Sequence, residues 1–163
     1  MSYIDKHLMD GENVVYRTKL HWIIFWGALI FLVLTVAAFA LYFYGSMNNN
    51  QDYKYIGGIL GVIFLLVTLV WGIHSFIPYA TSEFGLTNKR VMIKTGFIRR
   101  DSLEILLTKV EAMHVSQGIT GRVFDYGTID IRGTGGTSNK FDRIHAPLEF
   151  RKRVLEQVSL TQK

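Results

Sequence analysis

Two long stretches without a charged side chain constrain this chain more than any other feature. Residues 20–51 and 55–82 contain no Asp, Glu, Lys or Arg, and the loop between them carries the polar run "NNNQDYK". A helix rises about 1.5 Å per residue, so about 20 residues cross the roughly 30 Å hydrocarbon layer of a bilayer. We therefore predict two membrane-spanning helices, over about residues 22–44 and 55–79, that form a helical hairpin.

Soluble alternatives fit the first stretch poorly. The segment "IIFWGALIFLVLTVAAFALYFY" is apolar on every face, whereas the core helix of a soluble domain is amphipathic. A signal peptide has a short apolar core close to its start, but here residues 1–21 precede a much longer apolar run. Residues 1–21 are therefore expected to be an N-terminal segment outside the membrane.

Basic side chains predict the orientation of the hairpin. The loop between the spans contains only Lys54, whereas the other span ends are flanked by Lys6, Arg17, Lys19, Lys89, Arg90, Lys94, Arg99 and Arg100. Positively charged flanks stay in the cytoplasm, so we expect a multi-pass membrane protein with both termini cytoplasmic. The absence of cysteine from the sequence agrees with that compartment.

Small residues suggest where the two spans approach each other. Ala37 and Ala38 lie in the outer half of the first span, and Gly57 and Gly61 form a G-x-x-x-G spacing at a similar depth in the second. Small side chains let helix backbones come close, which favours packing inside lipid. Packing within one chain and contact between two copies are both compatible with this spacing.

Residues 80–163 have the composition of a basic, mostly β domain. The first 79 residues contain equal numbers of acidic and basic side chains, so the whole net charge of +5 lies in this part. Alternating apolar residues and turn sequences predict strands near residues 82–87, 90–95, 97–105, 110–117, 128–132 and 139–144. The end of the chain, "APLEFRKRVLEQVSL", predicts one amphipathic helix with Pro147 in its first turn.

Several sequence pieces resemble the bacterial pleckstrin-homology-like (PH-like) family of small two-span membrane proteins. The most specific pieces are "TNKRV" and "GITGRVFDYGT", and "DGENVVYRTKLHW" resembles that family's approach to its first span. The resemblance implies an α+β membrane protein of the bacterial inner membrane. It would consist of a transmembrane helical hairpin and a seven-stranded, PH-like β-sandwich or open barrel capped by the C-terminal helix. The seventh strand lies either within residues 97–107 or at Val14–Thr18.

The sequence offers no sign of catalysis. "GTGGTSNK" lacks the Gly-Lys-Ser/Thr ending and the following helix of a phosphate-binding loop, so it predicts a glycine-rich turn. The five histidines are scattered and no nucleophile or zinc motif occurs. We expect a protein that is not an enzyme, with no metal, no cofactor and no nucleic acid partner.

Two functional hypotheses follow. The first is a membrane-anchored interaction module that binds a protein partner or its own copies through a sheet edge or the groove beside the C-terminal helix. The second is an accessory protein of the cell envelope that senses anionic lipid, with its membrane-facing cations being Lys89, Arg90, Lys94, Arg99 and Arg100. These cations also fit a simpler role as signals for insertion.

The hairpin orientation is testable with reporter fusions. A reporter placed after Lys163 or before Ser2 is expected on the cytoplasmic side, and one inserted at Asn49 on the outer side, because the cations flank only the inner span ends. Accessibility to a membrane-impermeant reagent measures each position. A cytoplasmic reporter at Asn49 would exclude the two-span hairpin.

Overall fold

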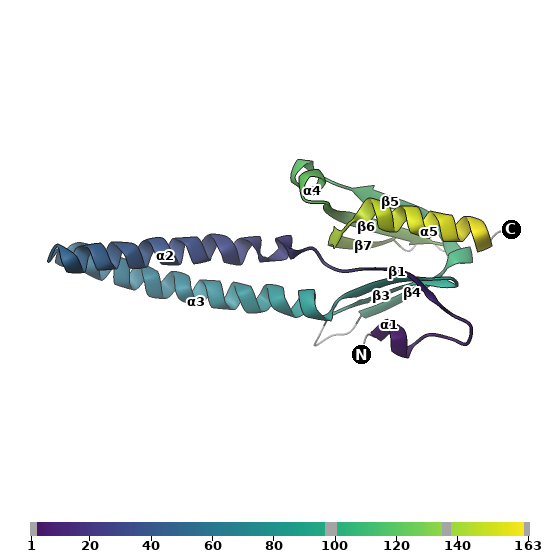
Figure 1. Cartoon of the computed structure of the whole chain (residues 1–163), viewed down its shortest axis with the longest axis horizontal. Coiled ribbons are helices and arrows are strands. Elements are labelled where there is room, and N and C mark those ends of the chain that lie inside the picture. The colour runs from purple at the N-terminus through teal and green to yellow at the C-terminus, as the bar shows by residue number, and fades with distance from the viewer. Residues whose placement is uncertain (1–2, 97–100, 135–137, 162–163) are drawn as a thin grey trace. The chain divides into compact units, whose positions relative to one another are not determined.

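The computed structural model of the protein describes residues 3–96, 101–134 and 138–161. It divides into two units (Figure 1), which we call the helical unit, residues 22–77, and the β unit, residues 1–21 and 78–163. Each unit is described by itself below.

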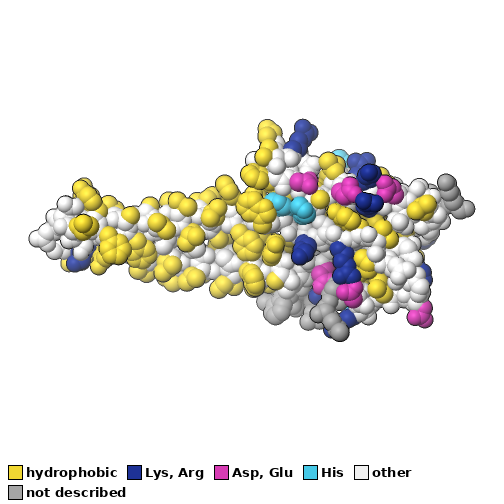
Figure 2. All heavy atoms as spheres, viewed as in Figure 1, with side chains coloured by type: hydrophobic (Ala, Val, Ile, Leu, Met, Phe, Trp, Pro, Cys, Tyr) yellow, Lys and Arg dark blue, Asp and Glu magenta, His cyan; other side chains and the backbone are white. Residues whose placement is uncertain are grey.

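The helical unit consists of a short 3-10 turn, η1 (Trp22–Phe25), and two long helices, α2 (Trp26–Met47) and α3 (Gln51–Thr81), the last turn of α3 belonging to the β unit. Both helices are long and apolar enough to cross a membrane, and only 11% of the most apolar window of each is buried. Figure 2 shows hydrophobic side chains along the face of these helices that is in view.

At the loop between them, both helices extend beyond the predicted spans. The first continues to Met47, and the second begins four residues early, at Gln51. The early start has a local cause, because the Asn50 side-chain oxygen accepts hydrogen bonds from the backbone N–H groups of Asp52 and Tyr53 at 3.1 and 3.3 Å. An asparagine in this position caps a helix and lets it begin inside the polar loop.

Close backbone packing joins the two helices. A Cβ atom on Gly57 would lie 2.5 Å from the backbone nitrogen of Tyr42 and 2.8 Å from the carbonyl oxygen of Ala38, and one on Gly61 would lie 3.2 Å from the Phe39 ring. Ala38 is buried with both glycines, whereas Ala37 is exposed. Within one chain, Gly57 therefore packs against Ala38 and Tyr42, and Gly61 packs against Phe39, whereas Ala37 is exposed.

The β unit contains two antiparallel sheets. The first has the order β1-β2-β3-β4, with β1 (Val14–Thr18), β2 (Glu83–Thr87), β3 (Arg90–Thr95) and β4 (Asp101–Leu106). The second has the order β5-β6-β7, with β5 (Val110–Ser116), β6 (Tyr126–Gly133) and β7 (Ser138–His145). A 3-10 turn, η2 (Leu107–Lys109), connects β4 to β5. These seven strands of the described residues include one near each of the six predicted from the sequence.

The N-terminal segment belongs to the β unit, which corrects our separation of residues 1–21 from the domain. β1 pairs with β2 and supplies the seventh strand of the described residues. Beyond β1, the N–H of His21 donates to the Arg143 carbonyl at 2.6 Å, and the N–H of His145 donates to the Lys19 carbonyl at 3.0 Å. Residues 19–21 therefore join the first sheet to β7 of the second. The sequence analysis named residues 14–18 as one candidate for the seventh strand, but it did not indicate the pairing with β2 or with β7, because these strands are more than 60 residues away.

The core lies between the sheets and is closed by α5 (Pro147–Thr161), which agrees with the predicted C-terminal helix. Phe150 and Val154 of α5 are fully buried among Phe84, Leu86, Val91, Ile93, Ile105, Leu107, Met113, Ile129, Ile131 and Ile144. One element was missed: the sequence "ITGRV", between the strands predicted near residues 110–117 and 128–132, forms the short helix α4 (Ile119–Val123). Five residues are too few for a helical period to be visible in a sequence.

The helix contact at Gly57 can be tested by oxidative crosslinking. The hydroxyl oxygens of Thr35 and Thr68 lie 3.4 Å apart, so a Thr35→Cys/Thr68→Cys pair in this cysteine-free chain is close enough for a disulfide. Adding Gly57→Leu is expected to slow disulfide formation, because the larger side chain pushes the backbones apart.

Gly72→Leu is the matched control, since a Cβ atom on Gly72 of the same helix meets nothing within 4 Å. Equal crosslinking rates in the Gly57→Leu and Gly72→Leu chains would show that the close approach at Gly57 does not occur.

Candidate functional site

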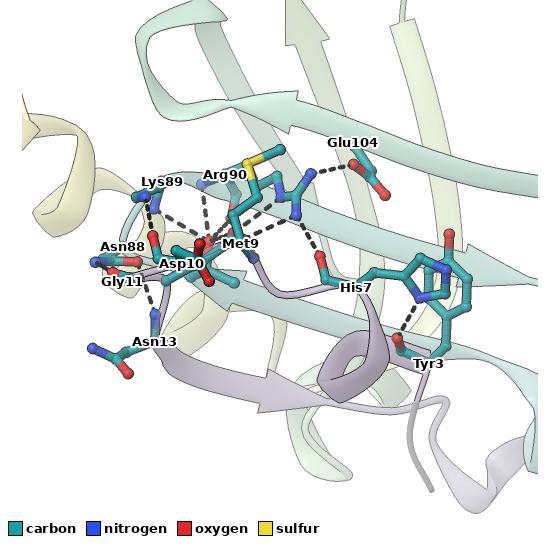
Figure 3. Close-up of polar contacts among 12 residues, drawn as sticks. Tyr3, His7, Met9, Asp10, Gly11, Asn13, Asn88, Lys89, Arg90 and Glu104 are labelled. Carbon is teal, nitrogen blue, oxygen red and sulfur yellow. Dashed lines mark hydrogen bonds and ion pairs between the residues drawn. The ribbon is translucent and has the colours of Figure 1, made fainter.

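Three of the cations predicted to face the membrane, Lys89, Arg90 and Lys94, contact an N-terminal clasp, which we define as residues 3–13. The clasp comprises α1 (Tyr3–Lys6) and the loop that leads to β1, and it crosses the hairpin of β2 and β3. Figure 3 shows the polar contacts between the clasp and this hairpin. The backbone N–H groups of Tyr3 and Ile4 donate to the Glu83 carboxylate at 3.1 and 3.3 Å, and Arg17 pairs with Asp5.

Arg90, at the start of β3, is the centre of these contacts. Its guanidinium donates to both carboxylate oxygens of Glu12 at 2.9 Å, to Glu104 at 2.6 Å and to the His7 carbonyl at 2.6 Å. The side chains of Arg90 and Glu12 are only 7% and 0% exposed. Thr87 completes the network by donating to Glu12 at 2.7 Å. The planar, two-point contact with Glu12 is the geometry in which Arg binds a carboxylate most strongly.

The charges of this network stabilise one another. Burial by itself raises the pKa of the Glu12 carboxyl, but hydrogen bonds from Arg90, from the Met9 amide and from Thr87 outweigh it and hold that pKa below its ordinary value. In return, the hydrogen bond to Glu12 raises the pKa of Arg90 despite its burial. Both groups are therefore charged at neutral pH, and neither is available to a ligand.

The other cations of this hairpin that the structure describes also have partners in the clasp. The ammonium of Lys89 donates to the Asp10 carbonyl at 2.9 Å, and that of Lys94 lies 5.3 Å from the centre of the Tyr3 ring. Asn88, at the turn, accepts from the Asn13 N–H at 3.0 Å and donates to the Gly11 carbonyl at 3.2 Å. The clasp thus occupies much of the surface that we predicted would meet lipid.

These positions correct one part of the predicted site. Arg90 is buried in an ion pair and does not face a membrane, because Glu12 and Glu104 surround its guanidinium. Lys89 remains exposed and Lys94 is partly exposed, while Arg99 and Arg100 lie outside the described residues. Sequence reasoning missed Glu12 as the partner of Arg90. The acidic residue in "DGENVV" was visible, but its pairing with a strand 78 positions away was not.

A second candidate site lies beside β5. In the described residues β5 is an edge strand, paired with β6 on one side only. A hollow of about 460 Å³ lies at its end and is lined by Val115, Gln117, Arg122, Asp125 and Leu148. It combines apolar side chains with both signs of charge, and α5 contributes Leu148. An open strand edge next to such a hollow is suited to an extended peptide, whose backbone pairs with the strand while its side chains enter the hollow.

The histidines and carboxylates of the described residues do not form a metal site, and His21 has a packing role. Within residues 3–96, 101–134 and 138–161, no three His, Asp or Glu side chains converge as metal ligands would.

His21 is buried, and its ring stacks on Tyr126 at 5.4 Å and on His145 at 5.6 Å. Burial, followed by the nearby His145, lowers the pKa of His21. Its role in this arrangement is to pack the chain against β6 and β7.

Two sheets of four and three strands closed by a C-terminal helix are the arrangement of a PH-like domain, and a comparison with protein families agrees. A family model described as bacterial PH domain matches residues 20–159, so the chain belongs to the bacterial PH domain family, as the sequence resemblance indicated. It is also similar to the crystal structure of a DUF1696 family protein with a pleckstrin-homology domain from Shewanella loihica PV-4. That match has 13% identity, covers 47% of this chain and 70% of the other, and has a TM-score of 0.38. No curated protein matches the chain.

The buried ion pair can be tested by substitution and pH. Arg90→Gln is expected to lower the free energy of unfolding of the β unit by about 3–5 kcal/mol, because it leaves the Glu12 carboxylate buried without its cation. Chemical denaturation of the full chain in detergent measures the loss. Lys140→Gln, which removes an exposed cation from β7, is the control and is expected to have little effect.

The same pair predicts a pH dependence. Because the folded-state pKa of Glu12 lies below the ordinary value of 4.5, its stabilisation is present above that pH and disappears as the pH falls through the folded-state pKa. Glu12→Gln is expected to remove this part of the acid sensitivity, whereas Glu111→Gln, at an exposed position, is not. An unchanged acid profile in Glu12→Gln would contradict the assignment.

Proposed function

We propose that this protein is a membrane-anchored, non-enzymatic interaction module at the cytoplasmic face of the bacterial inner membrane, which binds an extended segment of a protein partner along β5. Membership of the bacterial PH domain family supports an interaction module. Anchoring in the membrane is supported by the two long helices, α2 and α3, which expose many large apolar side chains. Exposed apolar helices of this length are stable in lipid and unfavourable in water.

The β5 edge is the better of the two candidate sites for a partner. The hairpin of β2 and β3 already has the clasp across it, whereas the hollow beside β5 is open. Val115 and Leu148 offer apolar contacts, and Gln117 and Asp125 offer polar ones. Backbone pairing along β5 would supply affinity, and these side chains would supply specificity. A second copy of the chain could dock in the same way.

Sensing of anionic lipid by the basic hairpin is the alternative function, and the geometry favours it less. The exposed ammonium of Lys89 is the observation in its favour, because an exposed cation near a membrane is attracted to anionic headgroups. Against it, Arg90 is neutralised by Glu12 and Glu104. Headgroup recognition usually needs several converging cations. In the described part of this hairpin, the cations besides Arg90 are Lys89 and Lys94, and both contact the clasp.

Photocrosslinking in native membranes tests the proposed partner site. A benzophenone amino acid in place of Leu148, which lines the hollow and is 55% exposed, is expected to capture a protein as a discrete product. The same group in place of Leu160, 64% exposed near the end of the same helix, is the matched control and is expected to capture none. Mass spectrometry then distinguishes another protein from a second copy of this chain.

Two outcomes would contradict the proposal. Equal capture at Leu148 and Leu160 would mean that the hollow has no special role. Capture of lipid alone at Leu148 would mean that the hollow meets the bilayer and does not bind a protein partner.

A further inference from the structure

The helix α4 presents an apolar surface outside the core. Ile119 and Val123 are 86% and 73% exposed, and Phe124, directly after the helix, is 42% exposed. Residues four positions apart lie on the same side of a helix, so Ile119 and Val123 form one apolar face. The exposed Arg122 lies beside this face. Figure 2 shows hydrophobic and cationic side chains together at the end of the β unit where α4 lies.

The other side of α4 is held firmly against the start of β6. A Cβ atom on Gly121 would lie 2.5 Å from the carbonyl oxygen of Tyr126, so only glycine allows this close approach. The Gln117 amide donates to the same Tyr126 carbonyl at 3.1 Å, and the hydroxyls of Thr120 and Tyr126 lie 2.8 Å apart. These contacts involve residues of the "GITGRVFDYGT" piece. They hold the apolar face of α4 in one outward orientation.

The position of α4 in the β unit is close to the point where the chain enters the first apolar segment. His21 is the residue before Trp22, and its ring stacks on Tyr126 at 5.4 Å with an interplanar angle of 26°. Tyr126 is two residues from Phe124, and its hydroxyl is hydrogen-bonded to that of Thr120 in α4. The Cα atoms of consecutive residues such as His21 and Trp22 are about 3.8 Å apart. The chain therefore leaves the β unit, after His21, next to α4. This proximity is set within the β unit itself.

We propose that α4 is a membrane-interface contact, in which Ile119, Val123 and Phe124 enter the boundary between headgroups and acyl chains. Arg122 would then pair with the phosphate of an anionic headgroup while its aliphatic stem stays among apolar groups. The occupant is a lipid surface because the chain exit lies beside α4 and because the face combines apolar groups with a cation. The inference rests on the proposed membrane anchoring. It adds a second attachment that orients the β unit on the bilayer.

Fluorescence quenching in reconstituted vesicles tests this contact. The cysteine-free full chain receives one cysteine at Gly118, where a Cβ atom meets nothing within 4 Å, and carries a nitrobenzoxadiazole label there. The vesicles contain phosphatidylcholine and phosphatidylglycerol with brominated acyl chains as quencher. Leu160→Cys is the control, because the C-terminal end of α5 and α4 lie at opposite ends of the β unit (Figure 1). We expect quenching at Gly118 to be roughly twofold stronger or more than at Leu160.

A third label separates this inference from the function on which it rests. Leu66→Cys, in the middle of α3, reports whether the helical hairpin is in the bilayer. Quenching at Leu66 with equal quenching at Gly118 and Leu160 would overturn the α4 contact and leave the anchoring intact. No quenching at Leu66 would overturn both. If α4 instead binds a protein, Gly118 stays unquenched in these protein-free vesicles, and the proposal is again wrong.

Substitutions of the apolar face and of Arg122 complete the test. Ile119→Ser/Val123→Ser is expected to reduce quenching at Gly118 to the level at Leu160, whereas Leu155→Ser/Leu160→Ser on α5 is expected to leave it unchanged. Arg122→Glu is a second variant at an exposed position, and it should weaken quenching in vesicles that contain phosphatidylglycerol more than in phosphatidylcholine alone. Unchanged quenching in both α4 variants would contradict the proposal.

Discussion

The β unit depends on one short segment, residues 18–21, through which the N-terminal strand reaches both sheets. The Thr18 hydroxyl donates to the His145 carbonyl at 2.6 Å, and backbone bonds link Lys19 and His21 to β7. An antiparallel sheet leaves unpaired backbone groups at its edges, and this segment satisfies those of β7 while β1 covers the edge of β2. The same residues lead directly into the first apolar helix. Residues 18–21 therefore both connect the two sheets and determine where the chain leaves the β unit.

The N-terminal residues have a second effect through the buried pair of Glu12 and Arg90. A charge buried without a partner is costly, so each of these two side chains requires the other, and Thr87 and Glu104 satisfy further hydrogen-bonding groups. The pairing brings the clasp across the hairpin of β2 and β3. In the sequence this hairpin resembles a cationic ligand-binding surface, but in the structure its cations hold the clasp in place. Two surfaces that remain open among the described residues are the edge of β5 and the outer face of α4.

These two surfaces suggest a division of roles within one small domain. The hollow beside β5 offers mixed polarity and an open backbone edge, which suits a peptide. The face of α4 offers exposed apolar side chains and one cation, which suits the boundary of a bilayer. Since α4 lies beside the chain exit, a bilayer contact there would fix the direction in which β5 faces the cytoplasm. The two proposals are compatible for that reason.

The sequence by itself determined the elements whose cause is local. The two apolar helices, one strand near each of the six predicted, and the C-terminal helix follow from uncharged length, from alternation and from a proline in a first helical turn. Only the tertiary structure decided the pairings between distant residues. It placed β1 in the first sheet, turned Arg90 inward toward Glu12, and oriented the five-residue α4 through Gly121 and Tyr126. The first two features depend on contacts between residues far apart in the chain, which a linear pattern does not show. The third is a helix too short to show a helical period in the sequence.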